Sequence, residues 1–155
     1  MIGITGKLRF SDGSPIHPLS GGFKYVINWV EPGKEFKGPL CDAITKRWPH
    51  APQKHALWAL AKYGNTQPGE MSVVQVQSDM AICSVVQDSS PPSEELVQST
   101  LSKLFPQVKE DQGSLHFLKG ASWSGMEKYL TDSYLKKGIH VCVYSNGQDE
   151  EGTQP

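Results

Sequence analysis

The sequence predicts an α/β protein in which a mixed, largely parallel sheet carries helices on both faces. Segments rich in β-branched and aromatic residues alternate with segments whose apolar residues recur at helical spacing. Such alternation is typical of strands joined by crossover helices. The length of 155 residues suits one domain. We expect that domain to cover residues 1–145 and a flexible, acidic tail to cover residues 146–155.

Composition and charge exclude several classes of protein. The chain is 37% hydrophobic and 20% charged, as in ordinary globular proteins. A net charge of -1 argues against binding nucleic acid mainly through phosphates. No apolar run approaches the roughly 20 residues that span a bilayer, and the first residues lack a signal-peptide pattern. The three widely spaced cysteines are expected to be reduced and buried. We expect a monomer without membrane contact, in the nucleus or cytoplasm.

The first strands and the first helix are predicted from apolar patterning and turn residues. Ile4–Phe10 alternates enough to form a strand, and Phe23–Val30 has the β-branched and aromatic content of a buried strand. Gly38 and Pro39 then open a helix, because proline is tolerated in the first helical turn. The apolar face of this helix consists of Leu40, Ala43, Ile44 and Trp48.

A second helix and a hairpin follow. The pattern predicts a helix over residues 52–63 with Leu57, Leu60 and Ala61 facing inward and Gly64 ending it. A tight turn at residues 77–79 then joins two strands. These strands are Ser72–Val76 and Met80–Val86.

The C-terminal part repeats the alternation of helix and strand. Ser93 is expected to cap a long helix, and Ser114–Leu118 to form a short strand. Ser124–Glu127 has the capping-box pattern and begins a helix that ends at Gly138. Ile139–Tyr144 is the last expected strand.

Two loops between a strand and a helix start are candidate ligand sites. Ligands of open α/β sheets bind beyond the carboxyl ends of the strands. Residues 31–40 and Lys119–Ser124 are expected there, and both present helix N-termini that favour an anion. Two such loops suit a diphosphate. Trp123 suits either stacking on a base or covering the core. The scattered histidines and the absence of known catalytic motifs predict neither a metal site nor a catalytic triad.

The residues around the first loop resemble those of a known family. Asn28-Trp29-Val30-Glu31, followed by Lys-Gly-Pro-Leu-Cys-Asp-Ala-Ile-Thr-Lys-Arg over residues 37–47, resembles the first ligand loop of macrodomains. The likeness is greatest to the subgroup with the terminal ADP-ribose protein glycohydrolase and the macrodomain of a poly(ADP-ribose)-activated chromatin remodeller. It continues through residues 69–74, 114–118 and 139–144, and so covers roughly Thr5 to Ser145. It implies a three-layer α/β/α macrodomain-like fold.

The resemblance implies ADP-ribose as the ligand. Its diphosphate would lie between the Gly38 and Gly120 loops, with the distal ribose near Asn28 and the adenosine half near Tyr144. No catalytic residue, metal or cofactor is implied. The implied ligand-binding residues are Asn28, Val30, Glu31, Gly38, Pro39, Leu40, Asp42, Lys119, Gly120, Ala121, Ser122, Trp123, Tyr144 and Asn146.

Departures from the family pattern bear on activity. The Gly-Asp pair whose aspartate accepts from the adenine amino group is matched here to Gly6-Lys7. A lysine has only donors, so Asp12 or the backbone would have to substitute. Gln75 matches the catalytic lysine of the glycohydrolase, and an amide cannot form a Schiff base. The second loop also contains no acid.

These departures favour a non-catalytic module that binds ADP-ribose or poly(ADP-ribose), free or on an ADP-ribosylated protein. Two alternatives stay open. One is an ADP-ribosyl hydrolase, deacylase or phosphatase acting on an ADP-ribose derivative, with Asp42, Glu31 or a bound water as base. The other is a degenerate macrodomain that serves as a protein-interaction module.

Overall fold

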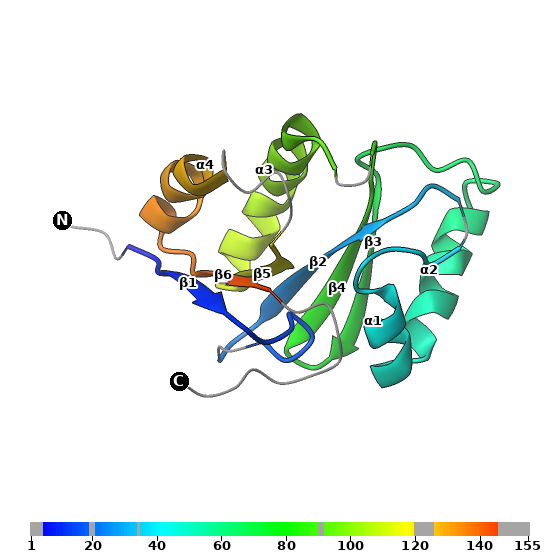
Figure 1. The fold of residues 1–155 in the computed structure, drawn as a ribbon, viewed down its shortest axis with the longest axis horizontal. Helices are drawn as coiled ribbons and strands as arrows, with labels where there is room; N and C mark the ends of the chain where they lie inside the picture. The colour runs from blue at the N-terminus through cyan, green and yellow to red at the C-terminus, as the bar shows by residue number, and fades with distance from the viewer. Residues whose placement is uncertain (1–4, 19–20, 34, 90–91, 120–125, 146–155) are drawn as a thin grey trace.

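The fold is a six-stranded sheet between two layers of helices (Figure 1). The computed structural model describes residues 5–18, 21–33, 35–89, 92–119 and 126–145. The strands are β1 (Leu8–Ser11), β2 (Lys24–Val30), β3 (Met71–Gln77), β4 (Met80–Val86), β5 (Ser114–Leu118) and β6 (Val141–Tyr144). The helices are α1 (Cys41–Arg47), α2 (His50–Leu60), α3 (Glu94–Glu110) and α4 (Met126–Ser133), followed by the short 3-10 helix η2 (Leu135–Lys137).

The sheet is mixed and largely parallel, as predicted. Its strand order is β1-β6-β5-β2-β4-β3, and every neighbouring pair is parallel except the β3–β4 hairpin. Five parallel strands therefore end at one edge of the sheet, which we call the carboxyl edge. The opposite edge is the amino edge. The last residues of the five parallel strands are Ser11, Val30, Val86, Leu118 and Tyr144.

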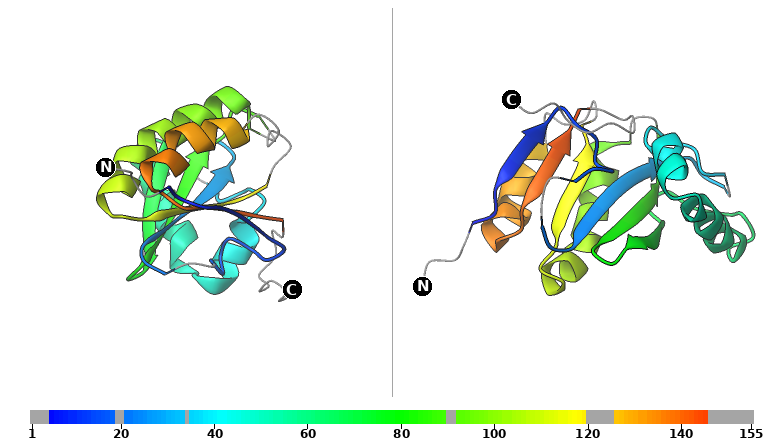
Figure 2. Two further views of the ribbon diagram at one scale, coloured as in Figure 1. Left: turned by 90° about the vertical axis from the view of Figure 1, so that its left-hand side faces the viewer. Right: turned by 90° about the horizontal axis from the view of Figure 1, so that it is seen from below.

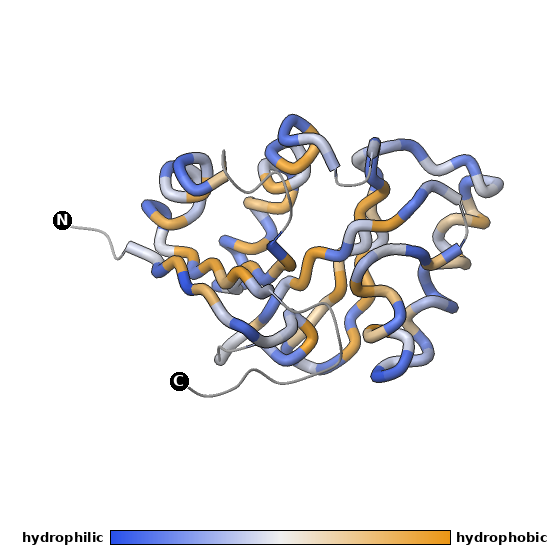
Figure 3. The backbone as a smooth tube through the Cα atoms, viewed as in Figure 1, coloured by the Kyte–Doolittle hydropathy of each residue, from blue (hydrophilic) through white to orange (hydrophobic). Residues whose placement is uncertain are grey.

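Helices α3 and α4 cover one face, and α1 and α2 cover the other (Figure 2). Alternate side chains of β2 enter the two layers. Tyr25 and Ile27 pack in the core beneath α3 and α4, whereas Val26 packs in the core beside α1. Figure 3 shows the hydrophobic segments concentrated in the strands and on the inward sides of the helices. This pattern is the one expected of a sheet covered on both faces.

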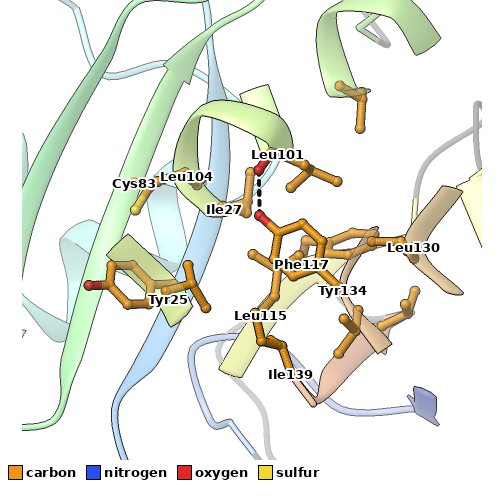
Figure 4. Packing of buried hydrophobic residues seen from close by; sticks show 14 of the residues in the cluster. Tyr25, Ile27, Cys83, Leu101, Leu104, Leu115, Phe117, Leu130, Tyr134 and Ile139 are labelled. Carbon is orange, nitrogen blue, oxygen red and sulfur yellow. Dashed lines mark hydrogen bonds between the residues drawn. The ribbon is translucent and has the colours of Figure 1, made fainter. Parts of the chain in front are cut away.

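In the core beneath α3 and α4, a buried hydrogen bond joins the two helical segments (Figure 4). Tyr134, which follows α4, is fully buried, and its hydroxyl donates to the carbonyl oxygen of Leu101 in α3 at 2.5 Å. A buried hydroxyl needs such a partner, because leaving it unpaired costs roughly 1–3 kcal/mol. The contact fixes the end of α4 against α3.

The core on the other face is built from α1, the start of α2 and the segment after β1. Ile16, in that segment, is 1% exposed and packs with Leu40 and Ile44. The apolar face predicted for the first helix is therefore confirmed. Its predicted start was wrong, because α1 begins at Cys41 and Gly38 and Pro39 belong to the preceding loop. Trp48, just after the last residue of α1, lies in the same cluster.

The start of α3 has the predicted cap. The Ser93 Oγ accepts from the backbone N–H of Leu96 at 3.2 Å. The carboxylate of Asp88 accepts from the Ser93 hydroxyl at 2.5 Å and from its backbone N–H at 3.0 Å. The segment between β4 and α3 is thus tied to the first turn of the helix.

Strand boundaries near the termini differ from the prediction. The first strand begins at Leu8 rather than at Ile4, which lies outside the described residues, and the last begins at Val141 rather than at Ile139. Gly6 donates its N–H to the carbonyl of Leu135 instead of pairing in the sheet. Lys7 and His140 still accept hydrogen bonds from Val141 and Leu115 of the neighbouring strands, but the regular strand pairing begins only at Leu8 and Val141.

The predicted inward face of the second helix was wrong. Helix α2 spans His50–Leu60, and Leu57 and Leu60 are 67% and 51% exposed. Its buried residues are Ala51, His55 and Ala59. The His55 Nδ1 lies 2.6 Å from the Ser72 Oγ of β3, and this buried polar contact sets the rotation of the helix. Hydropathy assigns inward positions to leucine and therefore misses an inward histidine.

The cysteines, the absence of a membrane span and the C-terminal tail were also predicted from the sequence. All three cysteines are free and buried, as predicted. Among the described residues, no helix is long and apolar enough to cross a membrane. The expected tail over residues 146–155 lies outside the described ranges.

Replacing Tyr134 with Phe should lower the free energy of unfolding by roughly 1 kcal/mol, because the buried hydrogen bond to Leu101 is lost. Urea denaturation followed by circular dichroism measures this change. Tyr63→Phe is the matched control, since the Tyr63 side chain is 97% exposed and should leave stability unchanged. Equal stability of the two variants would contradict a stabilising role for the Tyr134 hydroxyl.

Candidate functional site

The loop after β2, described at residues 31–33 and 35–40, folds back over the end of its own strand. The Glu31 N–H donates to the carbonyl of Lys37 at 2.9 Å and closes the loop. Gly38 lies so close to β2 that a β-carbon built on it would be 1.9 Å from the carbonyl oxygen of Trp29. Only glycine fits there without movement of the backbone. We call residues 31–40 the β2–α1 loop.

The Asn28 side chain points into the protein interior, where it supports this loop, and it does not project toward a ligand. Its side chain is fully buried, and its Nδ2 donates to the Ser84 Oγ at 3.0 Å. The same nitrogen lies 3.5 Å from the Cys41 Sγ at the start of α1. Asn28 therefore connects β2, β4 and α1. Burial raises the pKa of the Cys41 thiol to about 12, so this sulfur is not a reactive thiolate.

The other predicted residues of this loop differ in exposure. Val30 and Leu40 are buried, so only their backbone can contribute to a ligand site. Glu31, Pro39 and Asp42 are exposed, and Gly38 is partly exposed. Asp42 stands in the first turn of α1, where its carboxylate interacts favourably with the helix dipole. Because α1 has only seven residues, its dipole provides little additional attraction for an external anion.

The ends of β5 and β6 form the neighbouring part of the carboxyl edge. The Lys119 N–H donates to the carbonyl of Tyr144 at 2.7 Å, and the Lys119 side chain is exposed. The Tyr144 ring is buried, and its hydroxyl lies 2.8 Å from the His116 Nδ1. The His116 Nε2 lies 2.7 Å from the Ser114 Oγ. Tyr144 therefore borders the edge through its backbone, with its ring inside the protein.

His116 is neutral in the folded protein. Burial, assisted by the positive charge of Lys24, lowers the pKa of His116 to about 3. A buried imidazole with hydrogen-bonding groups at both nitrogens serves to join strands. It is not available as a general base near pH 7.

The second predicted loop lies mostly outside the described residues. Gly120, Ala121, Ser122 and Trp123 are not described, and neither is Asn146. Lys119 marks the beginning of this loop at the carboxyl edge.

The structure corrects the interpretation of Gly6-Lys7. Lys7 precedes β1, and its N–H donates to the His140 Nδ1 at 2.9 Å. Both residues precede parallel strands, so they lie at the amino edge, away from the candidate site. The residue that follows the carboxyl end of β1 is Asp12, which is exposed. The backbone N–H of Ser145, just after β6, donates to the carbonyl of Ser11 at 3.0 Å. Asp12 directly follows Ser11 and therefore lies close to the end of β6.

The structure also corrects the interpretation of Gln75. This residue is exposed on β3, pairs with Ala81 near the hairpin turn, and therefore lies toward the amino edge. Its identity cannot decide what chemistry occurs at the carboxyl edge. The glutamine at that edge is Gln87, which directly follows β4, is 7% exposed, and donates its N–H to the carbonyl of Val30 at 2.9 Å. Its position immediately after a predicted buried strand was the sequence signal that could have identified it.

Charge at the carboxyl edge is mixed. The described acidic residues beyond the strand ends outnumber the basic ones: Asp12, Glu31, Glu35, Asp42 and Asp88 against Lys37 and Lys119. Among the described residues, the groups that could hold an anionic ligand here are backbone N–H groups and these two lysines. Within the described ranges, no group of three His, Cys, Asp or Glu side chains could hold a metal ion.

Comparison with solved structures identifies the fold. No protein-family model and no curated protein matches the sequence. A macrodomain protein from Streptomyces coelicolor superposes with a TM-score of 0.77 at 20% identity, covering 90% of this chain and 99% of that one. The DarG macrodomains of Mycobacterium tuberculosis and Thermus aquaticus superpose with TM-scores of 0.68 and 0.66 at 17% and 18% identity. Each match covers 91% of this chain and 99% of the other.

The chain therefore has the macrodomain fold, and the predicted three-layer α/β/α architecture is confirmed. The likeness is to macrodomains in general. It does not single out the glycohydrolase and chromatin-remodeller subgroup.

Gly38→Ala should destabilise the protein by about 1–3 kcal/mol, because the added β-carbon must displace the Trp29 carbonyl. Gly21→Ala is the control, since a β-carbon at Gly21 meets nothing within 4 Å. Chemical denaturation of both variants measures the difference. A Gly38→Ala protein as stable as the Gly21→Ala protein would show that the loop does not depend on this contact.

Stability should decrease as the pH falls below about 6.5. The unfolded chain protonates His116 near its ordinary pKa of 6.5, whereas the folded protein resists protonation down to about 3. The unfolded state therefore binds more protons within this window. Between pH 7 and pH 5, His116 alone should account for about 2 kcal/mol of lost stability. Urea titrations at several pH values should show a shallower slope for His116→Gln, and identical slopes would contradict the assignment.

Proposed function

We propose that the chain belongs to the macrodomain family and binds ADP-ribose, free or attached to a protein, at the carboxyl edge of its sheet. The observation that carries the proposal is the closed β2–α1 loop at the end of β2 in a protein of macrodomain fold. Open α/β sheets bind ligands at this edge. A loop fixed in advance loses little conformational freedom when a ligand binds.

Two cations support a diphosphate at this position. Lys37 lies in the β2–α1 loop and Lys119 directly follows β5, and β2 and β5 are neighbouring strands. Both side chains are exposed, and the Lys37 Nζ lies 3.5 Å from the Glu35 carboxylate, an ion pair on the surface. A diphosphate between the two strand ends would have a lysine on each side. The exposed backbone at Gly38 would allow the phosphates to approach closely.

Asp12 provides the acceptor for the adenine amino group in this proposal. It follows the carboxyl end of β1, close to the end of β6, and its carboxylate is exposed. A carboxylate accepts hydrogen bonds and can therefore pair with an exocyclic amine. The departure suggested by Lys7 no longer stands against adenine recognition.

We propose that the protein binds without catalysis. Two side chains that could act as nucleophile or base are engaged inside the protein: the Cys41 thiol is buried and neutral, and His116 is buried between Ser114 and Tyr144. Gln87 has an amide, which supplies neither an amine nucleophile nor a base. Glu31 and Asp42 are exposed carboxylates and are the bases that a hydrolytic alternative would use.

We propose that residues 1–145 form the binding domain and that it acts as a monomer. The structural neighbours named above come from bacteria. We therefore propose that the protein acts in the cytoplasm, and we no longer propose the nucleus.

Calorimetric titration with ADP-ribose should give a one-to-one complex. Lys119→Ala and Lys37→Ala should each weaken it about tenfold, because each removes a charge-assisted contact to phosphate. Lys46→Ala is the control, since Lys46 is an exposed lysine in the last turn of α1, away from the loop. No heat at millimolar ADP-ribose would contradict the proposal and favour the protein-interaction alternative.

The same protein should release no ADP-ribose from an ADP-ribosylated protein. Release that Glu31→Gln or Asp42→Asn abolishes would replace the binding proposal with the hydrolase alternative.

A further inference from the structure

A second concave site lies on the α3 face of the sheet, between α3 and the edge strand β3. Helix α3 leaves part of the edge strand β3 uncovered, and a groove of about 770 Å³ results. Its floor includes Tyr25 and Ala81, which stand near the amino ends of β2 and β4. The groove therefore shares no residue with the β2–α1 loop. Its volume is in the range of small-ligand sites, about 300–1,000 Å³.

One wall of the groove carries opposite charges at its two ends. Lys103, Gln107 and Asp111 follow one another at four-residue spacing and so share one side of α3. The Lys103 Nζ lies near Gly69, just before β3, at 3.6 Å from a β-carbon built there. Glu70, which attracts Lys103 electrostatically, makes its ion pair with Lys62 instead, at 2.8 Å. Eight residues of helix separate the ammonium-bearing residue from the carboxylate-bearing one, a rise of about 12 Å.

Asp111 stands where the helix itself disfavours a carboxylate. It caps the C-terminus of the 17-residue α3, the negative end of the helix dipole. The hydroxyl of Tyr25 and the Nε2 of Gln107 (3.0 Å) both donate to its Oδ2. Figure 4 shows the Tyr25 hydroxyl directed away from the other labelled core side chains. The bond from Tyr25, then that from Gln107, lowers the pKa of Asp111, so the carboxylate remains charged. Among the described residues, its Oδ1 has no hydrogen-bond partner.

Between the charged ends the groove combines apolar surface with amides. Val73 on β3 is 56% exposed, and Phe23 is partly buried beside Tyr25. Gln75 on the β3 side faces the same groove as Gln107 on the α3 side. A glutamine amide both donates and accepts, which matches the alternating N–H and C=O groups of a peptide backbone.

We propose that this groove binds a short extended peptide with free ends, its ammonium toward Asp111 and its carboxylate toward Lys103. Three or four extended residues at about 3.3 Å each span 10–13 Å, which matches the separation of the two charged residues along α3. The apolar side chains of the peptide pack on Val73 and Phe23, and its backbone pairs with the two glutamine amides. This site is independent of ADP-ribose binding.

Titration of the ¹⁵N-labelled protein with the tetrapeptide Ala-Val-Val-Ala, with both termini free, tests the proposal. We expect saturable shifts of the amide signals of Val73, Gln75, Lys103 and Gln107. The same peptide with an acetylated amino end and an amidated carboxyl end should bind at least about tenfold more weakly, because both charges are gone. No shift at 10 mM peptide, shifts confined to other parts of the chain, or equal binding of the blocked peptide would overturn the proposal.

Two substitutions separate binding from folding. Lys103→Met keeps the length of an exposed side chain and should weaken the free peptide about tenfold, while Lys54→Met, on the exposed side of α2, should not. Asp111→Asn should also weaken binding, and its thermal unfolding shows whether loss of the Tyr25 contact alters the fold. Unchanged affinity of the Lys103→Met protein would overturn the proposal. ADP-ribose titrations of these variants should match the unmodified protein, so either proposal can fail without the other.

Discussion

The approach of Gly38 to the carbonyl oxygen of Trp29 sets the shape of the candidate site, because a β-carbon there would lie 1.9 Å from that oxygen. The contact is possible only where α1 begins close against the end of β2. Asn28 secures the same junction from the other side, through Ser84 of β4 and the Cys41 sulfur at the start of α1. The loop is therefore positioned by two contacts, the close approach of Gly38 to β2 and the hydrogen bonds of the Asn28 amide. These two contacts also determine where the exposed residues of the loop lie.

Most of the fold could be predicted from the sequence, because the central strands have β-branched and aromatic content that their burial requires. Ser114–Leu118 and the Ser93 cap were predicted with the observed boundaries. The failures occurred where a tertiary contact overrides hydropathy. Leu57 and Leu60 face solvent because the buried contact between His55 and Ser72 determines which side of α2 faces β3. No periodicity of apolar residues could reveal that a histidine would take the inward position.

The candidate site was predictable only as far as its loops. The β2–α1 loop was predicted from a buried strand and a Gly-Pro helix start, although the helix itself begins only at Cys41. The roles of Asn28 and Tyr144 required the structure, since both side chains are turned inward. Lys7 and Gln75 were misplaced for a shared reason. Which edge of a sheet a residue occupies depends on strand direction and register, and a motif match along the chain does not contain that information. Parallel pairing of β1 with β6 and antiparallel pairing of β3 with β4 put both residues toward the amino edge.

Buried polar groups on the α1 side of the sheet explain why the carboxyl edge is well defined. The apolar residues of adjacent strands could pack in more than one register, since a valine matches another valine nearly as well. The hydrogen bonds between His116 of β5 and Tyr144 of β6, and between Asn28 of β2 and Ser84 of β4, form in one register only. A slipped strand would leave these groups buried and unpaired, at roughly 1–3 kcal/mol each. The interior thus contains polar groups in place of some apolar side chains, and these groups specify a single strand register. That register brings Val30, Gln87, Lys119 and the β2–α1 loop together at one end of the sheet.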